Sequence, residues 1–181
     1  MQLWIKGIAL ATLASSLMVG CSSTPVSDTT AKKVVVMHAV TASGVGAEIG
    51  TVTLSDGPQG LVISPNLKGL PSGERGFHIH ENPSCQPAEK DGVAGAALAA
   101  GSHYNPHQVP NHGTTLTGHL GDLPALYVNS NGVANMTTTA PRLKLADVSG
   151  RALMIHAGGD NYSDHPQALG GGGARIACGL I

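Results

Sequence analysis

Short stretches rich in β-branched and apolar residues recur along the chain from residue 34 onward, separated by clusters of Gly, Pro, Asn and Asp. Alternation with a period of two, or a short continuous apolar run, is typical of a β-strand. The stretches with this pattern are residues 34–41, 49–54, 60–66, 76–81, 125–129, 133–138, 152–156 and 175–180. We therefore predict an all-β fold, an eight-stranded antiparallel Greek-key barrel or sandwich.

The longest interval between predicted strands, residues 82–124, has little regular pattern apart from an Ala-rich stretch at 93–100. A loop of this length inside a compact domain is unusual unless it has a function or is tied down. Cys85 and four of the nine histidines of the chain lie in it. We therefore expect the functional chemistry to involve this loop.

Residues 1–20 have the pattern of an export signal. Lys6 precedes an apolar run at residues 7–19, which is too short for an ordinary transmembrane helix but suits a secretory signal peptide. The small residues before Cys21 resemble a bacterial lipobox, although Met18 replaces the usual Leu. We predict a lipoprotein-type signal peptide at 1–20, with Cys21 as the lipid-bearing first mature residue. The alternative is simple cleavage nearby that leaves Cys21 as a free thiol.

Residues 22–33 are small and polar, a composition that buries too little apolar surface to order itself. We expect a flexible tether there, followed by one folded domain at residues 34–181. This organisation predicts a protein of the periplasm or cell envelope that contacts a membrane only through a lipid anchor at Cys21.

Composition narrows the function further. A chain of 181 residues suits one domain with a hydrophobic core and is short for two catalytic domains. Its formal net charge of −1 lacks the strongly basic footprint of a nucleic-acid binder, so we expect no nucleic-acid partner. Nine histidines are many for this length and direct attention to metal binding.

His78 and His80 lie in one predicted strand and alternate with apolar residues. Side chains two residues apart in a strand project from the same face, about 7 Å apart. Two imidazoles at this separation can bind one metal ion. Two histidines on the solvated face of a strand are the alternative, and this pair by itself does not decide between them. His156, at the end of another predicted strand, can add a third imidazole.

The long loop adds a second set of candidate ligands: His103, His112, His119 and Asp122. Three imidazoles and a carboxylate fill a tetrahedral zinc site, which would tie the loop down. His107 lies among them and can either compete for the metal or point outward. Because imidazole binds copper as well as zinc, the residues alone predict one or two nitrogen-rich metal sites in an exported protein.

Four motifs, in this order along the chain, resemble those of copper,zinc superoxide dismutase: GFHIHE at 76–81, GSHYNP at 101–106, GHLGDLP at 118–124 and GGARIACG at 172–179. GGDNYSD at 158–164 and the glycines at 170–173 resemble the bacterial exported branch of that family. The resemblance covers about residues 34–181. It implies a Greek-key β-barrel with long metal-binding loops and the cofactors copper and zinc.

The resemblance also implies roles for single residues. The copper ligands would be His78, His80, His103 and His156. The zinc ligands would be His103, which both metals share, and His112, His119 and Asp122. Asp160 matches a carboxylate that accepts hydrogen bonds from one ligand of each metal, here His78 and His112. Arg175 matches a cation beside the copper channel that binds the anionic substrate; a surface ion pair is the alternative.

The resemblance also implies a disulfide between Cys85 and Cys178. An exported protein meets an oxidising compartment, in which such a bond persists. The bond would fasten the long loop to the barrel. Two separate buried thiols are the alternative. Cys21 would then be the odd cysteine, which agrees with its attachment to lipid.

The activity implied is conversion of superoxide to O₂ and H₂O₂ by alternating Cu(II) and Cu(I), which would protect the cell envelope from exogenous superoxide. The alternative is an exported copper- or zinc-binding buffer without dismutase activity. Monomer and homodimer both stay open. We interpret His38 and His165 as structural or solvated. Lys90 is a candidate for guiding the anion, because residues 157–173 contain no Lys or Arg, although a solvated charge is the ordinary interpretation.

Overall fold

A computed structural model describes residues 1–2 and 31–181 of the chain. The predicted signal peptide after residue 2, Cys21 and the tether up to residue 30 lie outside the described residues. Strand β1 begins at Lys32, slightly before the domain boundary expected at residue 34.

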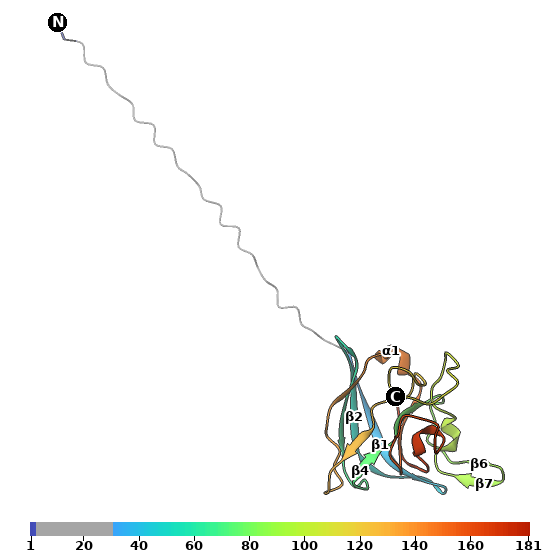
Figure 1. Cartoon of the computed structure of the whole chain (residues 1–181). Coiled ribbons are helices and arrows are strands. Elements are labelled where there is room, and N and C mark those ends of the chain that lie inside the picture. Colours follow the sequence, from blue (N-terminus) through green and yellow to red (C-terminus); the bar gives the residue numbers. More distant parts are fainter. Residues whose placement is uncertain (3–30) are drawn as a thin grey trace.

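Seven strands form one antiparallel sheet that curls around the core (Figure 1). Their order across the sheet is β5-β10-β11-β1-β2-β3-β9, and every neighbouring pair is antiparallel. These strands are β1 (Lys32–Thr41), β2 (Gly44–Gly57), β3 (Gly60–Leu67), β5 (Phe77–His80), β9 (Thr138–Ala140), β10 (Ala152–His156) and β11 (Arg175–Leu180).

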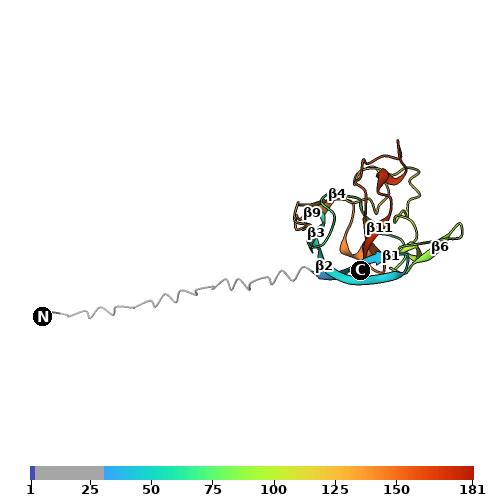
Figure 2. The same cartoon turned by 90° about the horizontal axis from the view of Figure 1, so that it is seen from below.

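Two small sheets complete the strands of the described residues. β4 (Gly73–Arg75) pairs with β8 (Leu126–Val128), and β6 (Ala88–Lys90) pairs with β7 (Val93–Gly95). The β6–β7 hairpin projects from the body in both views (Figures 1 and 2). Within residues 31–181, helical structure is limited to α1 (Leu145–Val148) and 3₁₀ turns at Leu98–Ala100 and Leu169–Gly171. No helix of the described residues has the length and apolar character needed to span a membrane.

The alternation seen in the sequence places one row of side chains of each long strand in the core. In β1, Val35 and Met37 are fully buried, whereas Val34 and Val36 are exposed. Successive side chains of a strand point to opposite faces, which explains the difference. Each fully buried apolar side chain of this size contributes about 1.5–3 kcal/mol. The neighbouring strands add Val52, Leu54, Leu61 and Ile63 to the same core.

The predicted all-β fold is confirmed, with a local difference at residues 133–138. They do not form a strand, and β9 begins only at the last of them. Ala134 instead exchanges two backbone hydrogen bonds with Leu67, each with an N···O distance of 3.0 Å. Asn129 Oδ1 accepts a hydrogen bond from the amide of Val133 at 3.1 Å, a local turn that the apolar pattern does not reveal.

The long loop is fastened to the sheet at several points. The predicted disulfide between Cys85 and Cys178 is confirmed and joins the start of the loop to β11. Its cysteines are 93 residues apart, and closing a loop of that size contributes on the order of 4–5 kcal/mol in the chain-entropy model. Farther along, the amide of Tyr104 donates to Ile79 O at 2.8 Å and the amide of Ile79 donates to Gly121 O at 2.9 Å. The loop therefore lies along the edge of β5 that faces away from β10.

Candidate metal centre

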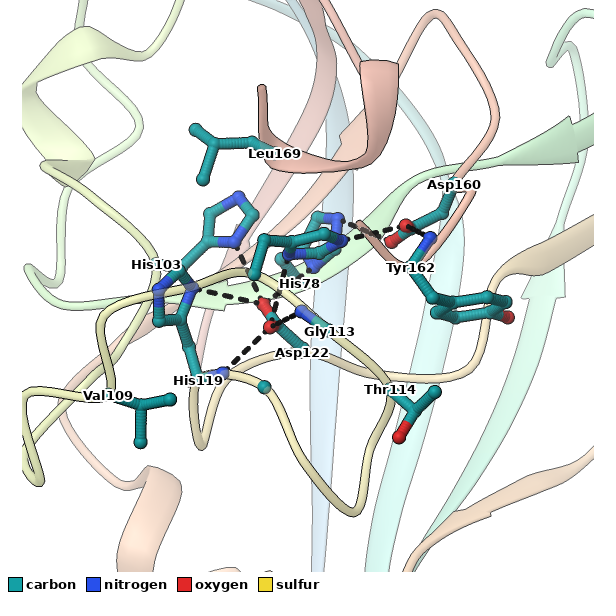
Figure 3. A network of polar contacts seen from close by, with 12 residues as sticks. His78, His103, Val109, Gly113, Thr114, His119, Asp122, Asp160, Tyr162 and Leu169 are labelled. Atoms are coloured by element: carbon teal, nitrogen blue, oxygen red, sulfur yellow. Dashed lines mark hydrogen bonds and ion pairs between the residues drawn. The ribbon is translucent and has the colours of Figure 1, made fainter. Parts of the chain in front are cut away.

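Buried polar side chains gather in one place, around β5 and the long loop (Figure 3). Among the described residues, the buried polar or charged ones are each at most 8% exposed: His78, His80, His103, His112, His119, Asp122, His156 and Asp160. They are the eight residues predicted as metal ligands or as their supporting carboxylate. Burying so many polar groups is costly unless they pair or bind a metal, so their convergence marks a functional site.

Strands β5 and β10 position three of the histidines. His78 and His80 alternate along β5, and His156 is the last residue of the neighbouring strand β10. The pairing of β10 with β11 shifts in register between Ile155 and His156. The amide of His156 donates to Gly76 O at 2.9 Å, which fixes the backbone at the point where this histidine enters the site.

The long loop brings its ligands alongside β5. His103 forms an isolated β-bridge with His80, and Asp122 forms one with His78. Gly121, next to Asp122, has no space for a side chain, because a Cβ there would overlap Ile79 O. Two distant segments of the loop therefore reach the histidines of β5 through backbone contacts.

Asp122 lies at the centre of the polar network (Figure 3). Its Oδ2 accepts hydrogen bonds from the amides of Gly113 at 3.1 Å and His119 at 2.8 Å. Its Oδ1 lies 2.9 Å from His103 Nδ1 and 3.5 Å from His119 Nδ1, and its Oδ2 lies 3.1 Å from His112 Nδ1. The carboxylate thus faces three imidazoles of the loop at once.

Two sets of ligand atoms lie close enough to share a metal ion, each with all its atoms within 4.8 Å of one another. The Asp122 group consists of His78, His103, His112 and Asp122, and the His156 group consists of His80, His103 and His156. His103 belongs to both groups. The geometry puts His78 in the Asp122 group, although the sequence assigns it to copper. Its ring centroid lies 4.0 Å from that of His103 and 5.3 Å from that of His156.

Several nitrogens inside the site are buried and make no hydrogen bond: His78 Nδ1, His103 Nε2, His112 Nδ1 and His119 Nδ1. A buried polar atom without a partner costs about 1–3 kcal/mol. Imidazole nitrogens and a carboxylate oxygen are the ligands that zinc and copper take in proteins. The residues therefore fit a pair of nitrogen-rich metal sites that share His103.

In four histidines of the site, a backbone carbonyl or Asp160 contacts the ring nitrogen on the far side from the proposed metal position. His80 Nδ1 lies 2.9 Å from Gly101 O, and His156 Nδ1 lies 3.1 Å from Gly173 O. A carbonyl only accepts, so each Nδ1 carries the proton and each Nε2 keeps its lone pair. These two Nε2 atoms lie 3.4 Å apart. Asp160 contacts the other two rings: its Oδ1 is hydrogen-bonded to His112 Nε2 at 2.7 Å, whereas its Oδ2 lies 3.2 Å from His78 Nε2 without a hydrogen bond.

Burial keeps the His156 group neutral. It lowers the pKa of His103 to about 4 and the pKa of His156 to about 3, because a buried imidazolium loses its hydration. Burial and the nearby Arg175 hold the pKa of His80 well below its usual value. At neutral pH these rings are therefore in the uncharged form that binds metals.

The Asp122 group has the opposite electrostatics. Burial alone would lower the pKa of His112, but the ionised Asp122 and Asp160, which contact the two nitrogens of the ring, outweigh it and raise this pKa to about 9. Burial would raise the pKa of both carboxyls, and their bonds to the histidines instead hold both values far below the usual range. Both aspartates are therefore ionised and supply negative charge to this half of the site.

Arg175 lies at the start of β11, beside the His156 group. Its Nη1 donates to Ala97 O and its Nη2 donates to Gly101 O, each at 2.6 Å. Gly101 O is also the carbonyl that His80 Nδ1 contacts. These bonds fix the guanidinium next to the site, and burial lowers its pKa without removing its charge.

His119, predicted as a zinc ligand, lies outside both groups, although its Nδ1 is 3.5 Å from Asp122 Oδ1. His38, His107, His165 and Lys90 also belong to neither group. His107, His165 and Lys90 are exposed, and Lys90 lies on the projecting β6–β7 hairpin. His38 is half-buried in β1, where its Nδ1 lies 3.2 Å from Gly46 O.

The structure adds a residue that the sequence did not single out. Arg142, between β9 and α1, donates to Thr115 O at 2.5 Å, to Gly118 O at 2.9 Å and to His119 O at 2.8 Å. It holds the backbone that carries His119. A single arginine in a predicted loop carries no motif, so only coordinates could reveal this contact.

Comparison with known proteins gives a consistent result. The family described as copper/zinc superoxide dismutase (SODC) matches residues 48–181. Superoxide dismutase [Cu-Zn] 2 of Salmonella typhimurium is 58% identical over 153 residues, which cover 83% of this chain and 88% of that protein.

Two solved structures are similar to this chain over 83% of its length and 99% of theirs. The copper/zinc superoxide dismutase of Brucella abortus is 50% identical, with a TM-score of 0.82. The protein described as the monomeric copper, zinc superoxide dismutase of Salmonella enterica is 57% identical, with a TM-score of 0.75.

Proposed function

The chain belongs to the copper/zinc superoxide dismutase family, and on this premise we propose how its residues share the work of that reaction. It is an oxidoreductase that converts two superoxide ions and two protons to O₂ and H₂O₂. The observation that carries the proposal is the set of buried imidazole nitrogens in one site that make no hydrogen bond. Without a metal, burying these nitrogens without hydrogen-bond partners would cost stability.

We assign copper to His78, His80, His103 and His156, and zinc to His103, His112, His119 and Asp122. The lone pairs of His80 and His156 Nε2, 3.4 Å apart, support the copper set. Asp122, which faces three imidazoles of the loop, supports the zinc set. When bound, copper would supply one-electron redox chemistry by alternating between Cu(II) and Cu(I), and zinc would hold the loop without redox change.

His103, which belongs to both the copper set and the zinc set, can also carry a proton for the reaction. Its Nδ1 lies 2.9 Å from Asp122 Oδ1, whereas its Nε2 is buried and makes no hydrogen bond. Formation of peroxide consumes protons, and we propose that His103 Nε2 takes up one of them in the first half of the cycle and supplies it to the peroxide product in the second. Burial lowers the pKa of His103 to about 4, so at neutral pH this ring is uncharged and does not carry a second proton.

Arg175 binds the anionic substrate in this proposal. A guanidinium has five N–H donors, and Arg175 uses two of its nitrogens on the carbonyls of Ala97 and Gly101. The remaining donors and the permanent positive charge can hold superoxide beside the His156 group. The same two bonds prevent the side chain from swinging away.

We also propose the location and state of the protein. The pattern of residues 1–20 supports export, and lipid at Cys21 would place the domain in the cell envelope on a tether of residues 22–33. The disulfide between Cys85 and Cys178 supports an oxidising compartment. The description of the Salmonella enterica protein as monomeric supports a monomer.

The experiment that tests the function compares metal content with turnover. The purified protein is loaded with copper and zinc, and its metal content and its rate of superoxide removal are measured on the same sample. We expect about one copper and one zinc per chain together with rapid removal of superoxide. Full metal occupancy without turnover would instead identify a metal buffer.

A further inference from the structure

Two aspartates of residues 157–173, the segment between β10 and β11, hold a single histidine of the zinc set. Asp160 Oδ1 lies 2.7 Å from His112 Nε2, at the ring. Asp164 Oδ2 accepts a hydrogen bond from the backbone amide of His112 at 2.9 Å. The second bond joins residues 52 apart in sequence, so it is a contact between two loops and not a local turn.

The other oxygen of Asp164 reaches a different residue. Asp164 Oδ1 accepts a hydrogen bond from the amide of Leu169 at 2.9 Å. Leu169 lies beside His103 in Figure 3. A cavity of about 420 Å³ is lined by Asp164 and Leu169 together with His103 and His119. One carboxylate therefore connects the backbone of His112 to a residue at the edge of this cavity.

We propose that Asp164 is a positioning residue that orients His112 toward zinc and links that ligand to Leu169. A ring held only at Nε2 can still pivot about that contact. Holding the backbone amide as well fixes both ends of the residue and aims Nδ1 at Asp122 Oδ2, 3.1 Å away. This inference rests on the proposed zinc set.

Asp164→Ala removes both acceptors, and Asp164→Asn keeps only one oxygen able to accept, because an amide NH₂ group only donates. Asp91→Asn is the matched control. Asp91 is exposed at the turn of the β6–β7 hairpin with a φ of 55°, a conformation that asparagine tolerates, and it gives the same change of charge.

The affinity for zinc is measured by competition with a chelator. The visible spectrum of Co²⁺ in the zinc position is recorded as a probe of ligand geometry. Loss of an outer contact to a metal ligand typically weakens metal binding about 10–100-fold. We expect that loss and an altered Co²⁺ spectrum for Asp164→Ala, a smaller loss for Asp164→Asn, and parent behaviour for Asp91→Asn.

Amide hydrogen exchange at His112 and Leu169 shows whether Asp164 orients the zinc ligand or only orders the loop around it. Faster exchange with a zinc affinity within twofold of the parent, and an unchanged Co²⁺ spectrum, would overturn the inference while the proposed function stands. If Asp164→Ala does not fold, the comparison of Asp164→Asn with Asp91→Asn decides by the same criteria. A parent protein that binds no zinc would overturn both the inference and the zinc set.

Discussion

At the scale of single residues, the site depends on what holds the nitrogen of each imidazole that faces away from the metals. The carbonyls of Gly101 and Gly173 hold His80 and His156, and Asp160 contacts His78 and His112. Such contacts fix both the tautomer and the orientation of a ligand. The ligands are therefore aimed before any metal arrives, which reduces the ordering needed on binding.

Arg175→Ala should keep both metals and lose much of the activity. Removing a charged hydrogen-bond donor to an anion costs about 1.5–3 kcal/mol, so we expect kcat/KM to fall roughly 10–100-fold. The measurement is turnover at several ionic strengths, with metal content determined on the same samples. Unchanged kcat/KM and unchanged salt dependence would contradict a role in binding the anion.

Gly170→Ala should disturb the zinc set through Asp160. A Cβ at Gly170 would overlap Asp160 Oδ1 and lie 2.8 Å from His112 Nε2, at a φ of +70°. Gly69→Ala is the control, because Gly69 has a φ of +76° with nothing within 4 Å. We expect Gly170→Ala to lower the free energy of unfolding by about 2 kcal/mol more than the control and to weaken zinc binding. Equal effects of the two variants in urea denaturation and zinc titration would contradict the crowding at Asp160.

At the scale of elements, the two strands that carry histidines into the site could be predicted, whereas the loops between ligands could not be described. The alternation of His78 and His80 and the end of a strand at His156 are periodic signals, and β5 and β10 agree with them. The contacts of Arg142 and Asp164 with the loop backbone join residues far apart in sequence and leave no periodic signal. Residues 133–138 look like a strand in pattern, yet Ala134 forms only an isolated bridge with Leu67.

The loop that carries His119 should depend on Arg142. Its guanidinium donates to three carbonyls of that loop, at Thr115, Gly118 and His119. Arg142→Ala should lower the free energy of unfolding by about 2–4 kcal/mol and weaken zinc binding. The measurements are urea denaturation and zinc titration.

Arg151→Ala is the control for this prediction, because Arg151 also donates to carbonyls, at Glu81 and Asp147. We expect it to lower stability and to leave zinc affinity near that of the parent. An equal loss of zinc affinity in both variants would contradict a specific role of Arg142 in holding the loop that carries His119.

At the scale of the whole molecule, a nearly neutral protein concentrates its functional charge in one place. The chain has 10 Lys and Arg against 11 Asp and Glu, and residues 157–173 carry no Lys or Arg. Lys90 lies on the projecting β6–β7 hairpin, outside both ligand groups. Local attraction of the anion therefore rests on Arg175 and the metals in this account.

The metal-free protein should lose stability in mild acid. The pKa values of His103 and His156 fall from 6.5 to about 4 and about 3 on folding, so the unfolded chain binds more protons below pH 6.5. Stability from these two groups is therefore present above pH 6.5 and is lost as the pH falls through this window. We expect the free energy of unfolding to fall by more than about 1 kcal/mol between pH of about 7 and about 4.5.

The raised pKa of His112 acts in the other direction. It contributes stability below pH 6.5 that is lost as the pH rises toward about 9. Urea denaturation of the metal-free protein across this range measures both effects. A free energy of unfolding that rises on acidification to pH of about 4.5 would contradict the neutral, buried state of His103 and His156.

The central claim is a pair of metal sites that share His103. A crystal structure of the copper- and zinc-loaded protein, with anomalous scattering recorded at the absorption edge of each metal, tests it most directly. The account predicts a copper peak bound by His78, His80, His103 and His156, and a zinc peak bound by His103, His112, His119 and Asp122. A single metal position, or a His103 that binds only one of the two metals in the oxidised protein, would contradict it.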